Sequence, residues 1–140
     1  MELGFESTSQ GAESPLWLDG LQLMTRVAFG RDSLDLHFDT GSTDTYLLPR
    51  FRKDFANFVD EQGKKSSETI TQISGSKEVE ILVLPEVVFR IGSFNAALRP
   101  CTVLQQSKGL VWAHGLLGMD VLGKARTVSL DFSRMALSME

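Results

Sequence analysis

Residues 34–39, Leu-Asp-Leu-His-Phe-Asp, alternate strictly between apolar and polar side chains. This period of two is typical of a β-strand that buries one face, because successive side chains of a strand point to opposite sides. The pattern stops at Thr40-Gly41, so the predicted strand ends on Asp39. Residues 21–29 form another apolar segment, separated from the first by the turn sequence Gly-Arg-Asp-Ser. We therefore expect a β-hairpin that leads directly into an acidic side chain.

The rest of the chain alternates short β-prone segments with turns and has few helical patterns. A helix is expected from Pro49 to near Gly63, where Phe and Val recur at intervals of three and four residues. A brief second helix is expected over residues 119–124. Further strands are expected at residues 46–48, 69–73, 79–84, 87–91, 97–104, 116–118, 127–132 and 135–139, with residues 64–68 as a polar connection. About nine strands and two small helices predict an all-β domain closed into a barrel.

The composition is that of a globular domain. The 140 residues are 42% apolar and 23% charged, and a chain of this size buries enough surface to fold without disulfides or metals. Its single cysteine, Cys101, has no partner for a disulfide within the chain. Residues 1–15 are expected to be a flexible leader or linker, because their first part is rich in Ser, Gly and Glu. The folded domain is then expected over residues 16–140.

Charge and hydropathy argue against two kinds of partner. The net charge is −4, and the 14 lysines and arginines are spread along the chain without a dense basic cluster. We therefore expect no binding to nucleic acid. The chain has no apolar run near the roughly 20 residues that a membrane span needs, so we expect no membrane insertion.

Two motifs stand out from this background. The first is Asp39-Thr40-Gly41-Ser42, although an Asp before a glycine at a strand end also serves simply to cap a turn. The second is Gly115-Leu116-Leu117-Gly118, two apolar residues between glycines just before the second predicted helix. A strand flanked by glycine allows another backbone segment to cross close beside the Asp39 loop.

With these motifs, residues 16–139 resemble the retropepsin-like aspartic proteases, the single-domain relatives of pepsin. The resemblance comprises a strand into Asp-Thr-Gly-Ser, a glycine-tipped flap hairpin over residues 71–81, the apolar-apolar-Gly segment with its helix, and a terminal hairpin over residues 128–137. Residues 117–122 and 129–132 look most like the bacterial members. The resemblance implies a closed retropepsin-like barrel with a flap hairpin and one or two short helices, and an aspartic endopeptidase without cofactor or metal.

The resemblance also implies that Asp39 acts in a pair. Aspartic proteolysis uses two adjacent carboxylates that share one proton, because two negative charges at hydrogen-bond distance do not both persist. This chain has one such motif, so the second Asp39 is expected from an identical chain in a homodimer that cleaves a peptide or protein. The alternatives are one lobe of a bilobal aspartic protease and a non-catalytic dimerisation or peptide-binding module. Relatives of the bacterial type favour an exported or periplasmic setting within a longer protein.

Each residue of the motifs has an implied role. Thr40 is expected to brace the two Asp39 loops, and Gly41 to allow close approach of the backbone to the carboxylates. Ser42 is expected to donate a hydrogen bond to a catalytic carboxylate, which would lower its pKa and favour an acidic optimum. The supporting residues are Leu116, Leu117 and Gly118, and the flap residues expected to bind substrate are Ile73, Ser74, Gly75 and Ser76.

Two residues depart from the pattern of the retroviral relatives. Met119 stands where retroviral relatives have the Arg of Gly-Arg-Asn or Gly-Arg-Asp, and Thr43 replaces the acidic residue after their Asp-Thr-Gly-Ala. The contacts between subunits are therefore expected to differ from theirs.

Trp17 and Trp112 are candidates for a substrate groove, an interface or the core.

The remaining polar groups suggest other chemistry less well. Asp35, His37 and Asp39 share a strand face as metal ligands would, but the chain has only two histidines and His114 has no second ligand cluster near it in sequence. No metal site is expected. Cys101 with His114 lacks the activating sequence of a thiol protease, so Cys101 is expected to be a buried structural thiol.

Overall fold

The computed structural model describes residues 2–4, 13–107 and 109–140. Within these residues the helices are α1 Pro49–Asp54, α2 Ala56–Gln62 and α3 Met119–Leu122. The strands are β1 Glu2–Gly4, β2 Ser14–Asp19, β3 Gln22–Phe29, β4 Asp32–Phe38, β5 Tyr46–Leu47, β6 Lys64–Gln72, β7 Gly75–Leu84, β8 Val87–Ile91, β9 Phe94–Leu98, β10 Cys101–Leu104, β11 Gly115–Leu117, β12 Thr127–Asp131 and β13 Ala136–Met139. The prediction of a mostly β fold with few short helices is confirmed.

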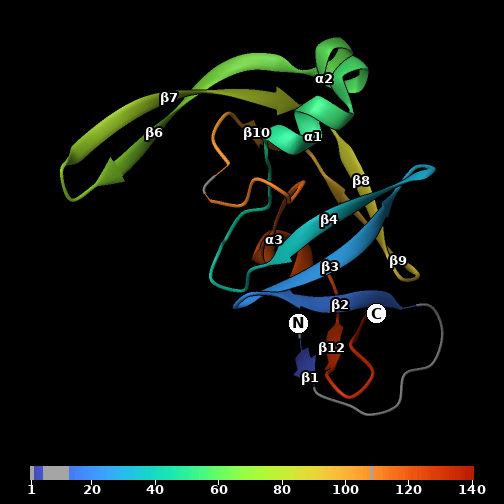
Figure 1. Cartoon of the computed structure of the whole chain (residues 1–140). Helices are drawn as coiled ribbons and strands as arrows, with labels where there is room; N and C mark the ends of the chain where they lie inside the picture. The colour runs from blue at the N-terminus through green and yellow to red at the C-terminus, as the bar shows by residue number, and fades with distance from the viewer. Residues whose placement is uncertain (1, 5–12, 108) are drawn as a thin grey trace.

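The strands pair in the order β1-β12-β13-β2-β3-β4-β11-β5-β10-β7-β6, and β8 and β9 attach through β3. At the centre, β11 lies between two strands from far earlier in the chain, parallel to β4 and antiparallel to β5. The pairings among the described residues form an open path, so closure into a barrel stays a prediction. The β6–β7 hairpin extends away from the strands around β3 and β4, and β1 lies at the other end of the molecule (Figure 1).

The predicted hairpin around the alternating segment is confirmed. β3 and β4 pair antiparallel, with Phe29 opposite Asp32 at the turn and Met24 opposite His37 at the other end. The alternation holds along β4, whose apolar side chains are buried and whose polar side chains near Asp39 are partly exposed. The terminal hairpin of β12 and β13 is also present.

The single helix predicted from Pro49 to near Gly63 is two helices. The backbone of Phe55 leaves the helical region, with φ −124° and ψ 43°, and separates α1 from α2. At this break the Phe55 ring packs on Phe29 and Phe51, with ring centroids 5.2 Å and 5.0 Å away. Aromatic packing of this kind is a tertiary effect, which periodicity along a helix does not reveal.

Two strand predictions were wrong in extent. Residues 64–68, predicted as a polar connection, form the first part of β6 and pair with β7. A hairpin pairs the backbone groups of polar and apolar residues alike, so side-chain polarity did not mark the end of this strand. Residues 97–104, predicted as one strand, divide between β9 and β10 at Arg99-Pro100, since proline has no N–H to continue a ladder.

The core consists of two groups of buried apolar side chains. The larger includes the apolar face of β4 and the aromatic group around Phe51. The second cluster contains Met24, Leu48, Ile81, Leu104, Leu110, Ala113 and Leu116, with Trp17, Tyr46, Val79 and Val83 packed against it. Because it includes residues of both β7 and β11, the second cluster connects the base of the β6–β7 hairpin to the centre of the sheet.

The described part of residues 1–15 contributes to two strands. β1 pairs parallel with β12, from Glu2 opposite Thr127 to Gly4 opposite Ser129. Ser14 begins β2 and is buried, and its Oγ accepts a hydrogen bond from the backbone N–H of Gly92 at 2.9 Å. The division into a leader and a domain at residue 15 stays a prediction. Within the described ranges, none of the helices has the length and apolar character to cross a membrane.

Candidate active site

Asp39 directly follows β4 and is partly exposed. Its backbone N–H donates to the carbonyl of Leu117 at 3.0 Å, which extends the pairing between β4 and β11 by one step. Its side chain folds over the next residues, because Oδ1 accepts a hydrogen bond from the N–H of Gly41 at 3.0 Å. A Cβ on Gly41 would lie 3.3 Å from that same oxygen, so the glycine allows a tight approach. Thr40 and Gly41 are exposed on the outside of this turn.

The Asp39 loop is crossed closely by the chain that leaves β11. The N–H of Met119 donates to the carbonyl of Ser42 at 2.8 Å, and a Cβ on Gly118 would lie only 2.4 Å from the carbonyl oxygen of Asp44. No other residue type fits there without a backbone shift, because real Cβ atoms do not approach that closely. The close crossing expected from the glycine-flanked motif is therefore confirmed. Leu116 and Leu117 are buried on either side of β11.

Thr45 and Asp120 hold this crossing together, and the sequence analysis missed both. Thr45 donates its hydroxyl to Asp120 Oδ1 at 2.6 Å and its backbone N–H to Oδ2 at 3.0 Å. The same hydroxyl accepts the N–H of Gly118 at 2.9 Å. Asp120 also accepts the N–H of Val121, at the start of α3. An acidic residue in the first turn of a predicted helix is a recognisable capping signal, but its reach to Thr45 is visible only in three dimensions.

The predicted hydrogen bond from Ser42 to the catalytic carboxylate is wrong for this structure. The Ser42 hydroxyl donates instead to the backbone carbonyl of Asp44 at 2.7 Å. This bond stabilises the loop locally and removes the basis on which an acidic optimum was predicted. Nearby, Thr43 is exposed with its hydroxyl 3.5 Å from Asp44 Oδ2, and Met119 packs against the larger core cluster.

His37 precedes Asp39 by two residues on the same face of β4. It lies opposite Met24 of β3 and in register with Leu116 of β11. Both ring nitrogens are buried and have no hydrogen-bond partner among the described residues. Burial lowers the pKa of His37, because the imidazolium form would lose its hydration, and the Asp39 carboxylate opposes that shift. The ring beside Asp39 is therefore neutral near pH 7.

The predicted flap tip is the turn of the β6–β7 hairpin. Ile73, Ser74, Gly75 and Ser76 are exposed there, and Ile73 is fully so, which means that it does not pack on the Asp39 loop. Gly75 has φ +126°, a conformation that residues with a side chain rarely adopt. Near the middle of the hairpin, Glu68 lies close to Tyr46, whose pKa is raised by burial and by the carboxylates of Glu68 and Asp44.

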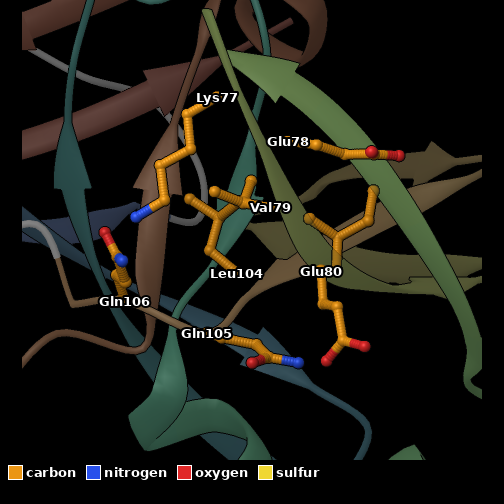
Figure 2. A pocket seen from close by; sticks show the side chains of 8 residues that line it. Lys77, Glu78, Val79, Glu80, Leu104, Gln105 and Gln106 are labelled. Atoms are coloured by element: carbon orange, nitrogen blue, oxygen red, sulfur yellow. The ribbon is translucent and has the colours of Figure 1, made fainter.

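A cavity of about 360 Å³ lies between the β6–β7 hairpin and the segment after β10. The residues that line it are Lys77, Glu78, Val79, Glu80, Ile81, Leu104, Gln105 and Gln106. Figure 2 shows the side chains of Val79 and Leu104 next to each other at the centre, with Gln106 to their left and Gln105 below. Val79, Ile81 and Leu104 belong to the second cluster together with Leu116. The apolar floor therefore continues to β11, on the side where Leu116 neighbours His37.

The alternative metal and thiol sites are not assembled. The described residues contain no group of three His, Cys, Asp or Glu side chains able to hold a metal ion. Asp35 instead binds Arg26, with 2.7 Å between Arg26 Nε and Asp35 Oδ1. Cys101 is buried, as expected for a structural thiol, and burial raises its pKa to about 12. The ring of His114 contacts Asp35 and Asp54 instead of Cys101.

The two tryptophans occupy different environments. Trp17 packs against the second cluster, with the Arg26 guanidinium 5.3 Å from its ring centre. Trp112 is partly exposed and lines an open groove beside α1 with Arg50 and Val111. Trp17 is thus at the border of the core, and Trp112 is at the surface.

Comparison with known proteins supports the fold. No protein-family model and no curated protein matches the chain. The crystal structure of the retroviral protease-like domain of Ddi1 from Leishmania major matches with a TM-score of 0.55 and 10% sequence identity, over 87% of this chain and 90% of that chain. A protein of unknown function from Legionella pneumophila matches with a TM-score of 0.45 and 10% identity, over 77% of this chain and 89% of that chain. Because the Ddi1 match extends over most of both chains, we conclude that this protein has the retropepsin-like fold.

Proposed function

We propose that the protein is an aspartic endopeptidase that works as a homodimer, with one Asp39 from each subunit. The observation that carries the proposal is the placement of Asp39, partly exposed directly after β4 in the loop that the chain leaving β11 crosses, within a retropepsin-like fold. The reaction needs two adjacent carboxylates, and each chain supplies one of them. A two-fold axis beside the exposed Thr40 and Gly41 would bring the second Asp39 to it and let the two loops brace each other.

The two carboxylates would share one proton. The ionised Asp39 accepts a proton from water as the water oxygen attacks the scissile carbonyl carbon, and the protonated Asp39 donates to the carbonyl oxygen. The Asp39 that took the proton from water then donates it to the nitrogen of the leaving amine, the other Asp39 accepts a hydroxyl proton from the tetrahedral intermediate, and the C–N bond breaks. No cofactor or metal takes part in these steps.

The β6–β7 hairpin is the part of the chain best placed to hold a peptide. Among the described residues, those at positions 75–80 of β7 pair with β6 but not with β10, so the edge of the hairpin beside the cavity is available to an extended backbone. Ile73, Ser74, Gly75 and Ser76 at the tip would cover the bound peptide. The neighbouring cavity would receive one of its side chains on the apolar surface of Val79 and Leu104.

The test is cleavage of a diverse peptide mixture between about pH 3 and pH 7, the range in which paired carboxylates titrate. Asp39→Asn keeps the shape of the side chain and removes its ionisation, so it should abolish cleavage. Asp32→Asn is the matched control, because Asp32 is an exposed aspartate at the other end of the same strand. It should cleave like the wild type.

Failure would identify the alternatives. A wild-type protein that is dimeric but cleaves nothing would be a binding or dimerisation module. A protein that is monomeric at high concentration and inactive would be a lobe that lacks its partner. Cleavage that persists in Asp39→Asn would exclude the proposed site altogether.

A further inference from the structure

His114 joins three parts of the molecule although it lies outside the proposed catalytic loop. Its side chain is 5% exposed. Its Nδ1 accepts a hydrogen bond from the backbone N–H of Asp35 in β4 at 2.9 Å, and its Nε2 lies 2.8 Å from Asp54 Oδ2 in α1. Its backbone N–H donates to the Asp35 carbonyl at 2.8 Å, and its carbonyl accepts the N–H of Leu48 at 2.8 Å.

These contacts fix the protonation state of the ring. The Asp35 N–H can only donate, so Nδ1 must present a lone pair. The ring proton is then on Nε2, where it donates to the Asp54 carboxylate. A second proton on Nδ1 would set two donors against each other and break the bond to Asp35. The arrangement therefore requires a neutral imidazole.

Both acidic and basic side chains lie near the His114 ring. Asp35 from β4 and Asp54 from α1 favour the protonated form, while Arg50 from α1 opposes it, and Arg26 from β3 pairs with Asp35. The Phe55 ring lies 6.0 Å from the imidazole. Burial is the largest effect and lowers the pKa of His114, so the ring is neutral at pH 7.

The segment that His114 fastens forms one side of the cavity. We call residues 105–107 and 109–114 the wall segment. Gln105 and Gln106 at its start line the cavity, as Figure 2 shows, and Leu110 and Ala113 bury themselves in the second cluster. A guanidinium N–H of Arg50 also contacts the carbonyl of Trp112. Among these attachments, only the hydrogen bond from the Asp35 N–H to His114 Nδ1 is broken when the ring gains a proton.

We propose that His114 is a positioning residue, whose neutral ring adds to its backbone bonds in holding the wall segment against β4, the strand that leads into Asp39. Acidification would then loosen one side of the cavity without touching the Asp39 loop, whose bonds to β11 and Asp120 do not involve His114. The part of this inference that concerns substrate rests on the proposed peptidase function. For that reaction, protonation of His114 would raise KM and change kcat little, because the cavity side of the site loosens and the carboxylates stay in place.

The direct test follows the exchange of the Asp35 amide proton, which reports the bond to Nδ1 and needs no activity. In ¹⁵N-labelled wild-type protein, the protection factor of this amide should fall about five- to tenfold between about pH 7.5 and pH 5, the effect of one hydrogen bond. In His114→Asn the amide oxygen stands three bonds from Cα, as Nδ1 does, and accepts the same proton without titrating. The protection of the Asp35 amide should then be independent of pH.

His37→Asn is the matched control, because His37 is the other histidine of the chain and sits on the same strand as Asp35. The pH dependence should persist in that variant. The inference is overturned if the wild type shows no loss of protection in acid, if the loss persists in His114→Asn, or if it disappears in His37→Asn.

Peptide cleavage is the second measurement, and it distinguishes the proposed role of His114 from the proposed peptidase function. If the protein is active, the ratio of KM at about pH 5 to KM at about pH 7.5 should be several-fold smaller in His114→Asn than in the wild type. An equal ratio, with the amide result as predicted, would show that the wall segment does not position substrate and overturn that part. If the protein cleaves nothing, the peptidase proposal fails while the amide exchange still decides whether His114 fastens the wall.

Discussion

The crossing between the Asp39 loop and the chain that leaves β11 and the β6–β7 hairpin are built in opposite ways. At the crossing, backbone segments approach so closely that Gly118 is required. The Thr45 hydroxyl accepts the Gly118 N–H, and Asp120 accepts the hydroxyl and the backbone N–H of Thr45. The hairpin has exposed side chains over most of its length and a tip held by its own backbone pairing. Segments with few buried contacts open at low free energy, whereas a packed crossing opens only with the domain. In the proposed peptidase, the packed crossing would hold the catalytic geometry and the hairpin would move to admit substrate.

The largest expected difference comes from two glycine substitutions. Gly118→Ala places a Cβ 2.4 Å from the Asp44 carbonyl oxygen, so the backbone must shift and stability should fall by about 3 kcal/mol or more. Gly75→Ala meets open space at φ +126° and should cost about 1 kcal/mol, from backbone strain alone. Urea unfolding measures both. Equal losses would mean that the crossing is no more constrained than the hairpin tip.

A smaller difference is expected between two threonines. Thr45→Val keeps the side-chain shape but leaves the Gly118 N–H unpaired and removes one of the two hydrogen bonds to Asp120 Oδ1, which should cost about 2 kcal/mol. Thr71→Val in the hairpin removes only an exposed contact with Ser76 and should change stability by less than about 0.5 kcal/mol. Thermal unfolding compares the two variants. A Thr45→Val protein as stable as the wild type would show that the polar bridge is not what holds the crossing.

His37 should contribute to the loss of stability as pH falls. Burial lowers its pKa, so the folded state binds fewer protons than the unfolded state, and the free energy of unfolding decreases as pH falls below about 6.5. His37→Leu removes this contribution and leaves that of His114, so its loss of stability between about pH 7.5 and pH 5 should be smaller than in the wild type. Denaturant titrations at the two pH values give the comparison. An unchanged loss would mean that His37 is not buried in its neutral form.

The smallest effect on stability is expected at the hairpin tip. Ile73→Ser should leave the free energy of unfolding within about 0.5 kcal/mol of the wild type, because the side chain is fully exposed. If the tip covers a bound peptide, KM for cleavage should rise in the same variant. A large loss of stability would show instead that Ile73 packs against something in solution, and so that the hairpin is not as free as its exposure indicates.

The parts of the fold that short sequence patterns determine were predictable. Strict alternation located β4, which ends at Phe38 directly before Asp39, and the paired glycines of residues 115–118 predicted a close crossing. The broken helix at Phe55 was missed because contacts with Phe29, more than twenty residues earlier, decide that conformation. The first part of β6 was missed because its pairing with β7, and not its own composition, makes it a strand.

The candidate site was predictable in its backbone and not in its hydrogen bonds. Residues 39–42 directly follow β4, but the Ser42 hydroxyl donates to the carbonyl of Asp44 and not to the Asp39 carboxylate. Thr45 and Asp120 lie 75 positions apart, so no local spacing connects them. His114 was interpreted as a loop residue without ligands nearby, whereas tertiary folding buries it between β4 and α1.

The central claim is that catalysis needs one Asp39 from each of two subunits, and subunit mixing tests it most directly. Wild-type protein is allowed to exchange with Asp39→Asn protein at a constant total concentration, and peptide cleavage is measured against the wild-type fraction. If both carboxylates are required, activity follows the square of that fraction, so an equal mixture has about one quarter of the wild-type activity. Activity that falls in simple proportion, to about one half, would mean that each chain carries its own complete site and would contradict the account.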